Sequence, residues 1–146
     1  MSATRFALVL GALALAWATV FAAQPECEIN EGSTSARVEH YLARLDDRSC
    51  VRRYGHGHPW YVAAEELGRI GEPAIPGLVG KLSTRNPYEL KLALYALMLA
   101  SQAPSAMQKT NGDYLRLGVV LSEEHNEQNR ALALAWWKRH AEQFRR

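Results

Sequence analysis

The sequence predicts an all-α protein built as a short solenoid of about three stacked helical hairpins. Apolar residues recur along the chain at the i, i+3, i+4, i+7 spacing that places them on one face of an α-helix. The same stripes return about forty residues later, as repeated helical hairpins require. The clearest stripes are Ala63, Leu67 and Ile70, followed by Ile75, Leu78, Val79 and Leu82.

The boundary between these two stripes predicts a very short turn. Gly71 follows the first stripe, where a helix favours a residue that adopts positive φ. Pro73 comes two residues later, and proline is well tolerated at the start of a helix because its missing N–H would have no partner there. We therefore expect one helix over Trp60–Ile70 and a second over Pro73–Leu82, packed side by side.

Two more helices are predicted around this pair. Tyr88–Ala100 is the most apolar segment of the chain after the N-terminal region, so we expect it at the centre of the core. Upstream, Thr34 or Ser35 can cap a helix through its hydroxyl group. The apolar stripe of that first helix is Val38, Tyr41, Leu42 and Leu45.

A third hairpin is predicted from the internal repetition. The stripe that begins at Ile75 reappears thirty-nine residues on, and the stripe of Tyr88–Ala100 reappears forty residues on. We expect a loop over Gln102–Asp113, a helix over Asp113–Leu121 and a final helix from Asn126. The residues expected to point inward are Tyr114, Leu117 and Leu121 on the first helix, and Leu134, Trp137, Ala141 and Phe144 on the second.

The segment from Leu67 to Leu82 resembles a known repeat. Its pattern, Leu67-Gly68-x-Ile70-Gly71-x-Pro73-Ala74-Ile75-Pro76-x-Leu78-x-x-x-Leu82, is similar to the HEAT-like repeat of the phycobilisome-lyase type. The resemblance is good over Val62–Ser101, weaker over Asp113–His140 and faint over Val38–Leu45. It implies an α-solenoid and, by analogy of fold alone, a protein that binds or scaffolds other proteins. It does not imply lyase activity, because no matching site residue is present.

The N-terminal residues have the layout of a secretory signal peptide. Met1–Arg5 carries a positive charge, Phe6–Val20 is apolar, and small residues follow at Ala22 and Ala23. A retained membrane anchor is the alternative, but the apolar run is shorter than the roughly 20 residues that span a bilayer. We expect residues 1–23 to be removed and residues 24–146 to form one exported domain, periplasmic or secreted. Within it, residues 24–34 are expected to be irregular and residues 46–59 to form a long loop.

Cys27 and Cys50 are the two cysteines of the chain, and both follow the predicted signal peptide. In an oxidising compartment, two cysteines of one small domain most simply form one disulfide. A metal pair or redox chemistry is the alternative, but the spacing is far from C-x-x-C and no second pair exists. The sequence therefore predicts a structural disulfide.

Charge and motifs argue against several classes of function. The whole chain has 17 Lys and Arg against 15 Asp and Glu, and removing residues 1–23 takes away only Arg5, which leaves 16 against 15. This balance gives no reason to expect a nucleic acid or an anionic membrane as partner. The serines lie outside any nucleophile motif, and the adjacent carboxylates would point in different directions on a helix. We predict no enzymatic activity, no catalytic residues and no cofactor.

The predicted loop contains the most distinctive residue cluster of the chain. Tyr, Trp and Arg are enriched at the residues that dominate binding energy in protein interfaces. Two alternatives remain: the aromatic residues simply pack the loop onto the first hairpin, or His56 and His58 bind a metal, for which further ligands would be needed. The candidate partner-binding residues are Arg52, Arg53, Tyr54, His56, His58, Trp60 and Tyr61.

A small solenoid presents an extended surface, so its expected function is the binding of another protein. The first hypothesis is an exported, non-enzymatic protein-binding or scaffold module of the cell envelope, with no stable membrane anchor after signal cleavage. The second is a periplasmic inhibitor or immunity protein that blocks a toxin or a hydrolase. The third is a metal- or ligand-carrying protein that uses His56 and His58.

Overall fold

The computed structural model of the protein describes residues 27–53 and 55–145. The predicted signal peptide lies outside the described residues, as do residues 24–26, Arg146 and Tyr54 of the candidate binding set. The described chain is mostly helical, so the all-α prediction is confirmed at that level, although a small two-stranded sheet was not expected.

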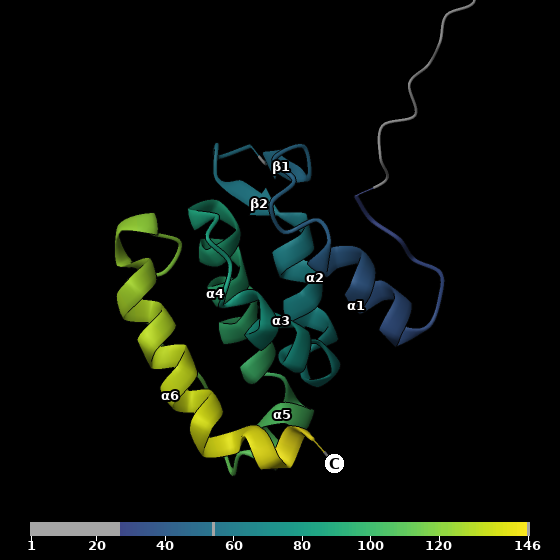
Figure 1. Cartoon of the computed structure of the whole chain (residues 1–146). Coiled ribbons are helices and arrows are strands. Elements are labelled where there is room, and N and C mark those ends of the chain that lie inside the picture. Colours follow the sequence, from purple (N-terminus) through teal and green to yellow (C-terminus); the bar gives the residue numbers. More distant parts are fainter. Residues whose placement is uncertain (1–26, 54, 146) are drawn as a thin grey trace, which may run out of the picture.

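The helices lie side by side, with α4 between α2 and α3 on one side and α6 on the other, and with α1 against the outer side of α2 (Figure 1). The strands lie at one end of this helical body (Figure 1). The helices are α1 (Thr34–Leu42), α2 (Val62–Ile70), α3 (Ile75–Lys81), α4 (Pro87–Ser101), α5 (Pro104–Lys109) and α6 (Asn126–Phe144). The other elements are β1 (Val51–Arg53), β2 (Pro59–Tyr61) and the 3-10 turns η1 (Glu72–Ala74) and η2 (Glu123–His125).

The turn between α2 and α3 confirms the sequence prediction. Gly71 has a φ of 77°, which a residue with a side chain rarely adopts, and Pro73 is the middle residue of the 3-10 turn that leads into α3. The first of these helices starts at Val62 instead of Trp60, because the two residues before Val62 belong to β2.

The first helix also begins close to its predicted start. Its cap is Ser33, whose Oγ accepts a hydrogen bond from Ala36 N at 3.2 Å, one residue before the expected position. Residues 27–33, which precede this cap, contain no helix. Leu45 lies beyond the end of α1 but is fully buried, so the predicted stripe does face the core.

Helix α4 forms the centre of the core, as its composition predicts. It starts at Asn86, whose side-chain oxygen accepts hydrogen bonds from the backbone N–H groups of Tyr88 and Glu89. Leu94 and Leu97 are fully buried between the neighbouring helices. Because α4 contacts α2, α3 and α6, its apolar residues surround the helix and do not form a single stripe.

One carboxylate is buried with this helix and is fully satisfied. Glu89 accepts a hydrogen bond from Lys81 Nζ at 2.6 Å and another from the hydroxyl of Thr84. Burial by itself raises the pKa of Glu89, but these two hydrogen bonds together outweigh it and hold the pKa below its usual range. The group therefore links the end of α3 to the start of α4 as an ion pair.

The helix predicted over Asp113–Leu121 is absent, and this prediction was wrong. The segment, here called the strap, has no helix or strand and is held instead by side chains of α6. Asn129 accepts a hydrogen bond from Gly118 N at 3.0 Å and donates one to Val119 O at 2.8 Å. Leu121 ends the strap with a positive φ of 57°, which is incompatible with a continuing helix. The predicted third hairpin therefore lacks its first helix, and the short helix α5 lies inside the segment expected to be a loop.

The inward face of α6 also differs from the prediction. Leu134 was expected to be buried but is 46% exposed, whereas Ala133 is fully buried and Trp136 is 1% exposed. Trp137 and Phe144 are partly buried, with their ring centroids 5.9 Å apart. The helix turns its Asn129, Ala133 and Trp136 face inward because that face makes the polar contacts to the strap.

The start of the strap is fixed to α6 by Asp113. Its backbone oxygen accepts a hydrogen bond from Trp136 Nε1 at 3.1 Å. Its carboxylate lies 2.6 Å from His140 Nε2 and 3.0 Å from a guanidinium nitrogen of Arg139. The hydrogen bond from His140, followed by that from Arg139, holds the pKa of Asp113 below its usual range.

Candidate functional site

The long loop predicted over residues 46–59 is partly a β-hairpin. Strands β1 and β2 pair antiparallel, with Val51 opposite Tyr61 and Arg53 opposite Pro59. Valine, tryptophan and tyrosine favour the extended backbone of a strand, and Gly57 in the connecting turn has a positive φ of 71°. Strands of three residues are difficult to recognise from sequence, so the sequence analysis predicted a loop here.

Both ends of the hairpin are attached to the helical body. The predicted disulfide is present: Cys27 and Cys50 are joined by an S–S bond of 2.10 Å, and Cys50 directly precedes β1. The other strand continues without a break into α2, where Val62 N donates to Cys50 O at 3.1 Å. The hairpin is therefore held at its base while its turn lies away from the helices (Figure 1).

The N-terminal segment that carries Cys27 is itself fixed to α1. Tyr41 Oη donates to Ile29 O at 3.2 Å and accepts from Ile29 N at 3.1 Å. The ring nitrogen Nε2 of His40 lies 3.2 Å from Cys27 O. The disulfide thus connects β1 to a segment that is already tied down.

The alternation of side chains along the strands divides the candidate binding residues between two faces. Residues directly opposite each other in an antiparallel pair point to the same face, and successive residues point to opposite faces. Arg52 and Trp60 therefore share one face, whereas Arg53 shares the other face with Tyr61. Sequence reasoning grouped all four together, and the structure does not.

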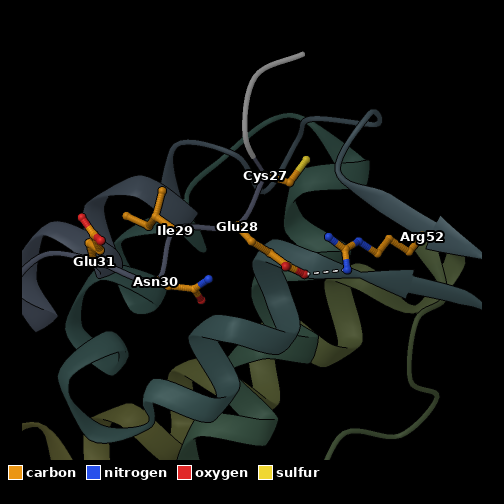
Figure 2. Close-up of a pocket in the computed structure, with 6 residues that line it drawn as sticks. All are labelled: Cys27, Glu28, Ile29, Asn30, Glu31 and Arg52. Atoms are coloured by element: carbon orange, nitrogen blue, oxygen red, sulfur yellow. Dashed lines mark ion pairs between the residues drawn. The ribbon is translucent and has the colours of Figure 1, made fainter. Parts of the chain in front are cut away.

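On the face of Arg52, a cavity of about 580 Å³ lies between the hairpin and the N-terminal segment (Figure 2). Glu28 reaches across it and forms an ion pair with Arg52 at 3.0 Å (Figure 2). Both side chains are partly exposed, so the pair contributes at most about 1 kcal/mol. The cavity is lined by Cys27, Glu28, Ile29, Asn30, Glu31 and Arg52.

On the opposite face, β1 and β2 form a cleft of about 360 Å³ with the start of α4 and with the residues that precede β1. Its lining combines three cationic side chains, two tyrosine rings and two apolar residues. We call it the basic–aromatic cleft, and its lining residues are Arg48, Val51, Arg53, Pro59, Tyr61, Tyr88 and Lys91.

The cationic groups of the cleft are positioned by its aromatic rings. The guanidinium carbon of Arg48 lies 3.9 Å from the centroid of the Tyr88 ring. Lys91 Nζ lies 4.8 Å from the same centroid and 5.9 Å from that of Tyr61. The two rings meet edge to face, with centroids 6.4 Å apart. Cations on ring faces are attracted by the quadrupole of the ring, which helps to hold these side chains in place.

The charges of the cleft are unbalanced. Lys91 forms an ion pair with Glu123 of η2 at 3.2 Å. Within residues 27–53 and 55–145, neither Arg48 nor Arg53 forms an ion pair with a carboxylate. Burial raises the pKa of Tyr88, so its hydroxyl stays protonated. Two carboxylates lie near enough to act on Tyr88: Glu123, and Asp47, which is hydrogen-bonded to Ser49. The three cations of the cleft still outnumber them, so this partly apolar surface is suited to an anionic group.

The sequence identified only part of this arrangement. Arg53 and Tyr61 belong to the predicted set, whereas Arg48, Tyr88 and Lys91 were not singled out. These three residues come from two further segments of the chain, and no local motif connects them. One sequence signal for the cleft was available: Lys91 follows Tyr88 by three residues in an otherwise apolar helix, so the two side chains share a face.

The histidines of the hairpin turn remain apart from both cavities. His56 and His58 are exposed and line neither of the two. No group of three or more His, Cys, Asp or Glu residues suited to a metal ion occurs within the described part of the chain. The described helices also include none that is long and apolar enough to span a lipid bilayer.

Comparison with protein-family models, curated proteins and solved structures finds no match for this chain. The hairpin and the basic–aromatic cleft are therefore the features from which a function can be inferred.

Proposed function

We propose that the protein is an exported, non-enzymatic protein-binding module of the cell envelope and that the β1–β2 hairpin contacts its partner. The observation that carries this proposal is the exposure of Trp60 on a hairpin attached at both ends. Trp60 is 42% exposed, although the large apolar residues of the helices around it are mostly buried. Exposed tryptophan is a frequent anchor of protein interfaces.

The attachment of the hairpin supports the same function. A loop that is ordered before binding loses less conformational entropy when the partner arrives, so more of the contact energy appears as affinity. The Cys27–Cys50 disulfide supplies this order at the start of β1. Because such bonds persist in oxidising compartments, the disulfide also supports export to the periplasm or the medium.

The helical body supports a scaffold role. The packing of α1 on α2 and of α3 on α4 is compatible with two HEAT-like hairpins, and the repeat-like sequence Leu67–Leu82 spans the boundary between them. In this proposal the helical body holds the hairpin at one end and presents it to the partner.

The proposal is tested by site-specific crosslinking in an extract of the cell envelope. A photo-crosslinking amino acid in place of His56 is expected to capture one stoichiometric partner, whereas the same amino acid in place of Leu134, which is exposed on α6, is not. Trp60→Ala is expected to weaken partner recovery by about tenfold or more, and Leu134→Ala to leave it unchanged. Unchanged recovery with folded Trp60→Ala protein would remove the hairpin from the binding surface.

The projecting hairpin also favours a second candidate, an inhibitor or immunity protein that inserts the hairpin into the active site of a toxin or hydrolase. A short loop held at its base and exposed at its tip has the shape for such an insertion. The activity of the captured partner separates the two candidates: an inhibitor abolishes it at equal concentration, and a scaffold leaves it intact.

A further inference from the structure

We propose that the basic–aromatic cleft binds a carboxylate of an acidic segment in the partner protein. This inference rests on the proposed function in one respect, that the partner is a protein. It adds the chemistry of recognition and assigns it to a face of the hairpin that does not carry Trp60.

The charges of the cleft favour an anion. Arg48, Arg53 and Lys91 line one cleft of about 360 Å³ and repel one another. Glu123 is the one carboxylate ion-paired to these cations among the described residues, and it contacts Lys91 alone. An external anion would bring opposite charge to the two arginines and so relieve this repulsion.

The geometry of Arg48 favours a carboxylate. Its guanidinium group lies over the face of Tyr88 at 3.9 Å, which covers the flat side of the group and leaves the edge with its N–H donors available. Two parallel N–H groups match the two oxygens of a carboxylate, and such bidentate pairs are stronger and more directional than a contact to a point charge. Arg53 lines the same cleft and supplies a second group of this type.

The apolar part of the lining distinguishes an acidic side chain from a bare inorganic anion. Val51 and Pro59 lie on the same face of the hairpin as Arg53 and Tyr61. These groups can contact the methylene groups of a glutamate side chain and the neighbouring peptide backbone. Phosphate and sulfate have no apolar atoms and would leave these walls without a contact, so the lining favours an acidic peptide.

The chain already places one of its own carboxylates at the edge of the cleft. Glu123 Oε1 lies 3.2 Å from Lys91 Nζ, although the two residues are 32 positions apart in the sequence. The side chain of Lys91 is only 13% exposed, whereas that of Glu123 is 42% exposed. The lysine is thus fixed in the protein while its carboxylate partner is accessible to solvent. Glu123 would therefore compete with an incoming carboxylate for Lys91.

This competition predicts opposite effects for two substitutions. The probe is a fluorescently labelled oligo-glutamate peptide with blocked ends. Its binding to the oxidised protein is measured by fluorescence anisotropy at about 0.15 M ionic strength, where charges beyond about 8 Å are largely screened. Replacing both arginines, Arg48→Ala with Arg53→Ala, is expected to weaken binding by about tenfold or more. Replacing the internal competitor, Glu123→Gln, is expected to strengthen binding by about three- to tenfold.

The matched control is Arg116→Ala. Arg116 also lies over a tyrosine ring, with its guanidinium carbon 4.2 Å from the centroid of Tyr114, but it is outside the cleft. Its substitution changes the net charge by the same amount as either single arginine substitution in the cleft. Binding to the Arg116→Ala variant is expected to stay within about twofold of wild type, because charges in high dielectric contribute little at long range.

Three results would overturn the proposal. The first is equal weakening by Arg116→Ala and by each single cleft variant, which would show binding through net charge alone. The second is unchanged or weaker peptide binding by the Glu123→Gln variant. The expected result is tighter binding, which a misfolded variant would not produce. The third comes from competition experiments. If inorganic phosphate, a heparin fragment or phosphatidylglycerol vesicles displace the peptide at lower concentrations than free glutarate does, the cleft binds those anions in preference to a carboxylate.

The same variants separate this inference from the proposed function. If Trp60→Ala abolishes partner capture but the wild-type protein does not bind the peptide, the protein-binding function is supported and the carboxylate site is refuted. If the arginine and Glu123 variants change peptide binding as expected but Trp60→Ala captures the partner as well as wild type does, the carboxylate site is supported. The face of the hairpin that carries Trp60 is then not part of the partner-binding surface.

Discussion

Replacing Gly68 with alanine measures how closely α2 approaches α4. Gly68 is buried on α2, and a Cβ atom built on it would lie 2.6 Å from Leu99 Cβ and 2.9 Å from Leu99 Cδ1 on α4. Contacts below 3.0 Å are essentially never seen for real Cβ atoms. The Cβ of Leu99 is fixed to the backbone, so a change of rotamer cannot remove it. The two helices must therefore move apart to accept the new methyl group.

Two effects of opposite sign decide the outcome. Alanine is a better helix former than glycine, which by itself would stabilise the protein by about 0.8–1 kcal/mol. Overpacking of a well-filled core costs about 1–3 kcal/mol, and contact with a backbone-fixed atom places this substitution in the upper half of that range. The expected net result is a loss of about 1–2 kcal/mol in the free energy of unfolding.

The assay is urea unfolding followed by circular dichroism, with Gly80→Ala as the matched control. Gly80 lies on α3 and a Cβ built there meets nothing within 4 Å, so the control is expected to gain up to about 0.8 kcal/mol. Leu99→Ala added to the Gly68 variant is not expected to restore stability, because it keeps the Cβ atom in contact. A Gly68→Ala protein as stable as wild type would show that α2 and α4 are farther apart than described.

Further predictions concern the disulfide and the strap. Reducing the Cys27–Cys50 bond, which closes a loop of sequence separation 23, is expected to lower the free energy of unfolding by about 3 kcal/mol in the chain-entropy account; an equal urea midpoint with and without reductant would contradict it. Asp113→Asn is expected to cost about 1 kcal/mol at neutral pH, after allowance for the solvent exposure of its ion pairs. The pKa of Asp113 is depressed by His140 and Arg139, so its contribution is fully present above the ordinary carboxyl pKa and is lost as the pH falls through the lower folded pKa. The stability difference between wild type and Asp113→Asn should therefore disappear in acid, and a difference independent of pH would refute the assignment.

The parts of the fold that local signals specify were predicted correctly. Gly71 and Pro73 mark the turn between α2 and α3 through backbone conformation alone, which needs no tertiary contact. The position of α4 in the core follows from its apolar composition, since a helix without a polar face has to be buried. The disulfide followed from the count of cysteines and the expected compartment.

The strap shows where local pattern was insufficient. Residues 113–121 carry an apolar spacing that a helix would also show, and in isolation the spacing predicts one. In the folded chain, the side chain of Asn129 and the cluster around Asp113 hold the same residues without a helix. These partners lie on α6, so their effect on the strap cannot be read from its own residues.

Amino-acid sequence alone thus determined that this chain is largely helical, where its central helices turn, and that Cys27 pairs with Cys50. Tertiary structure decided which residues of the hairpin work together. The pleat of β1 separates Arg52 from Arg53, and the packing of α4 beneath the hairpin brings Tyr88 and Lys91 to the second of these arginines. The physical reason is range: backbone preferences and periodic burial act over a few residues, whereas a cleft is made by side chains that meet only after the chain has folded.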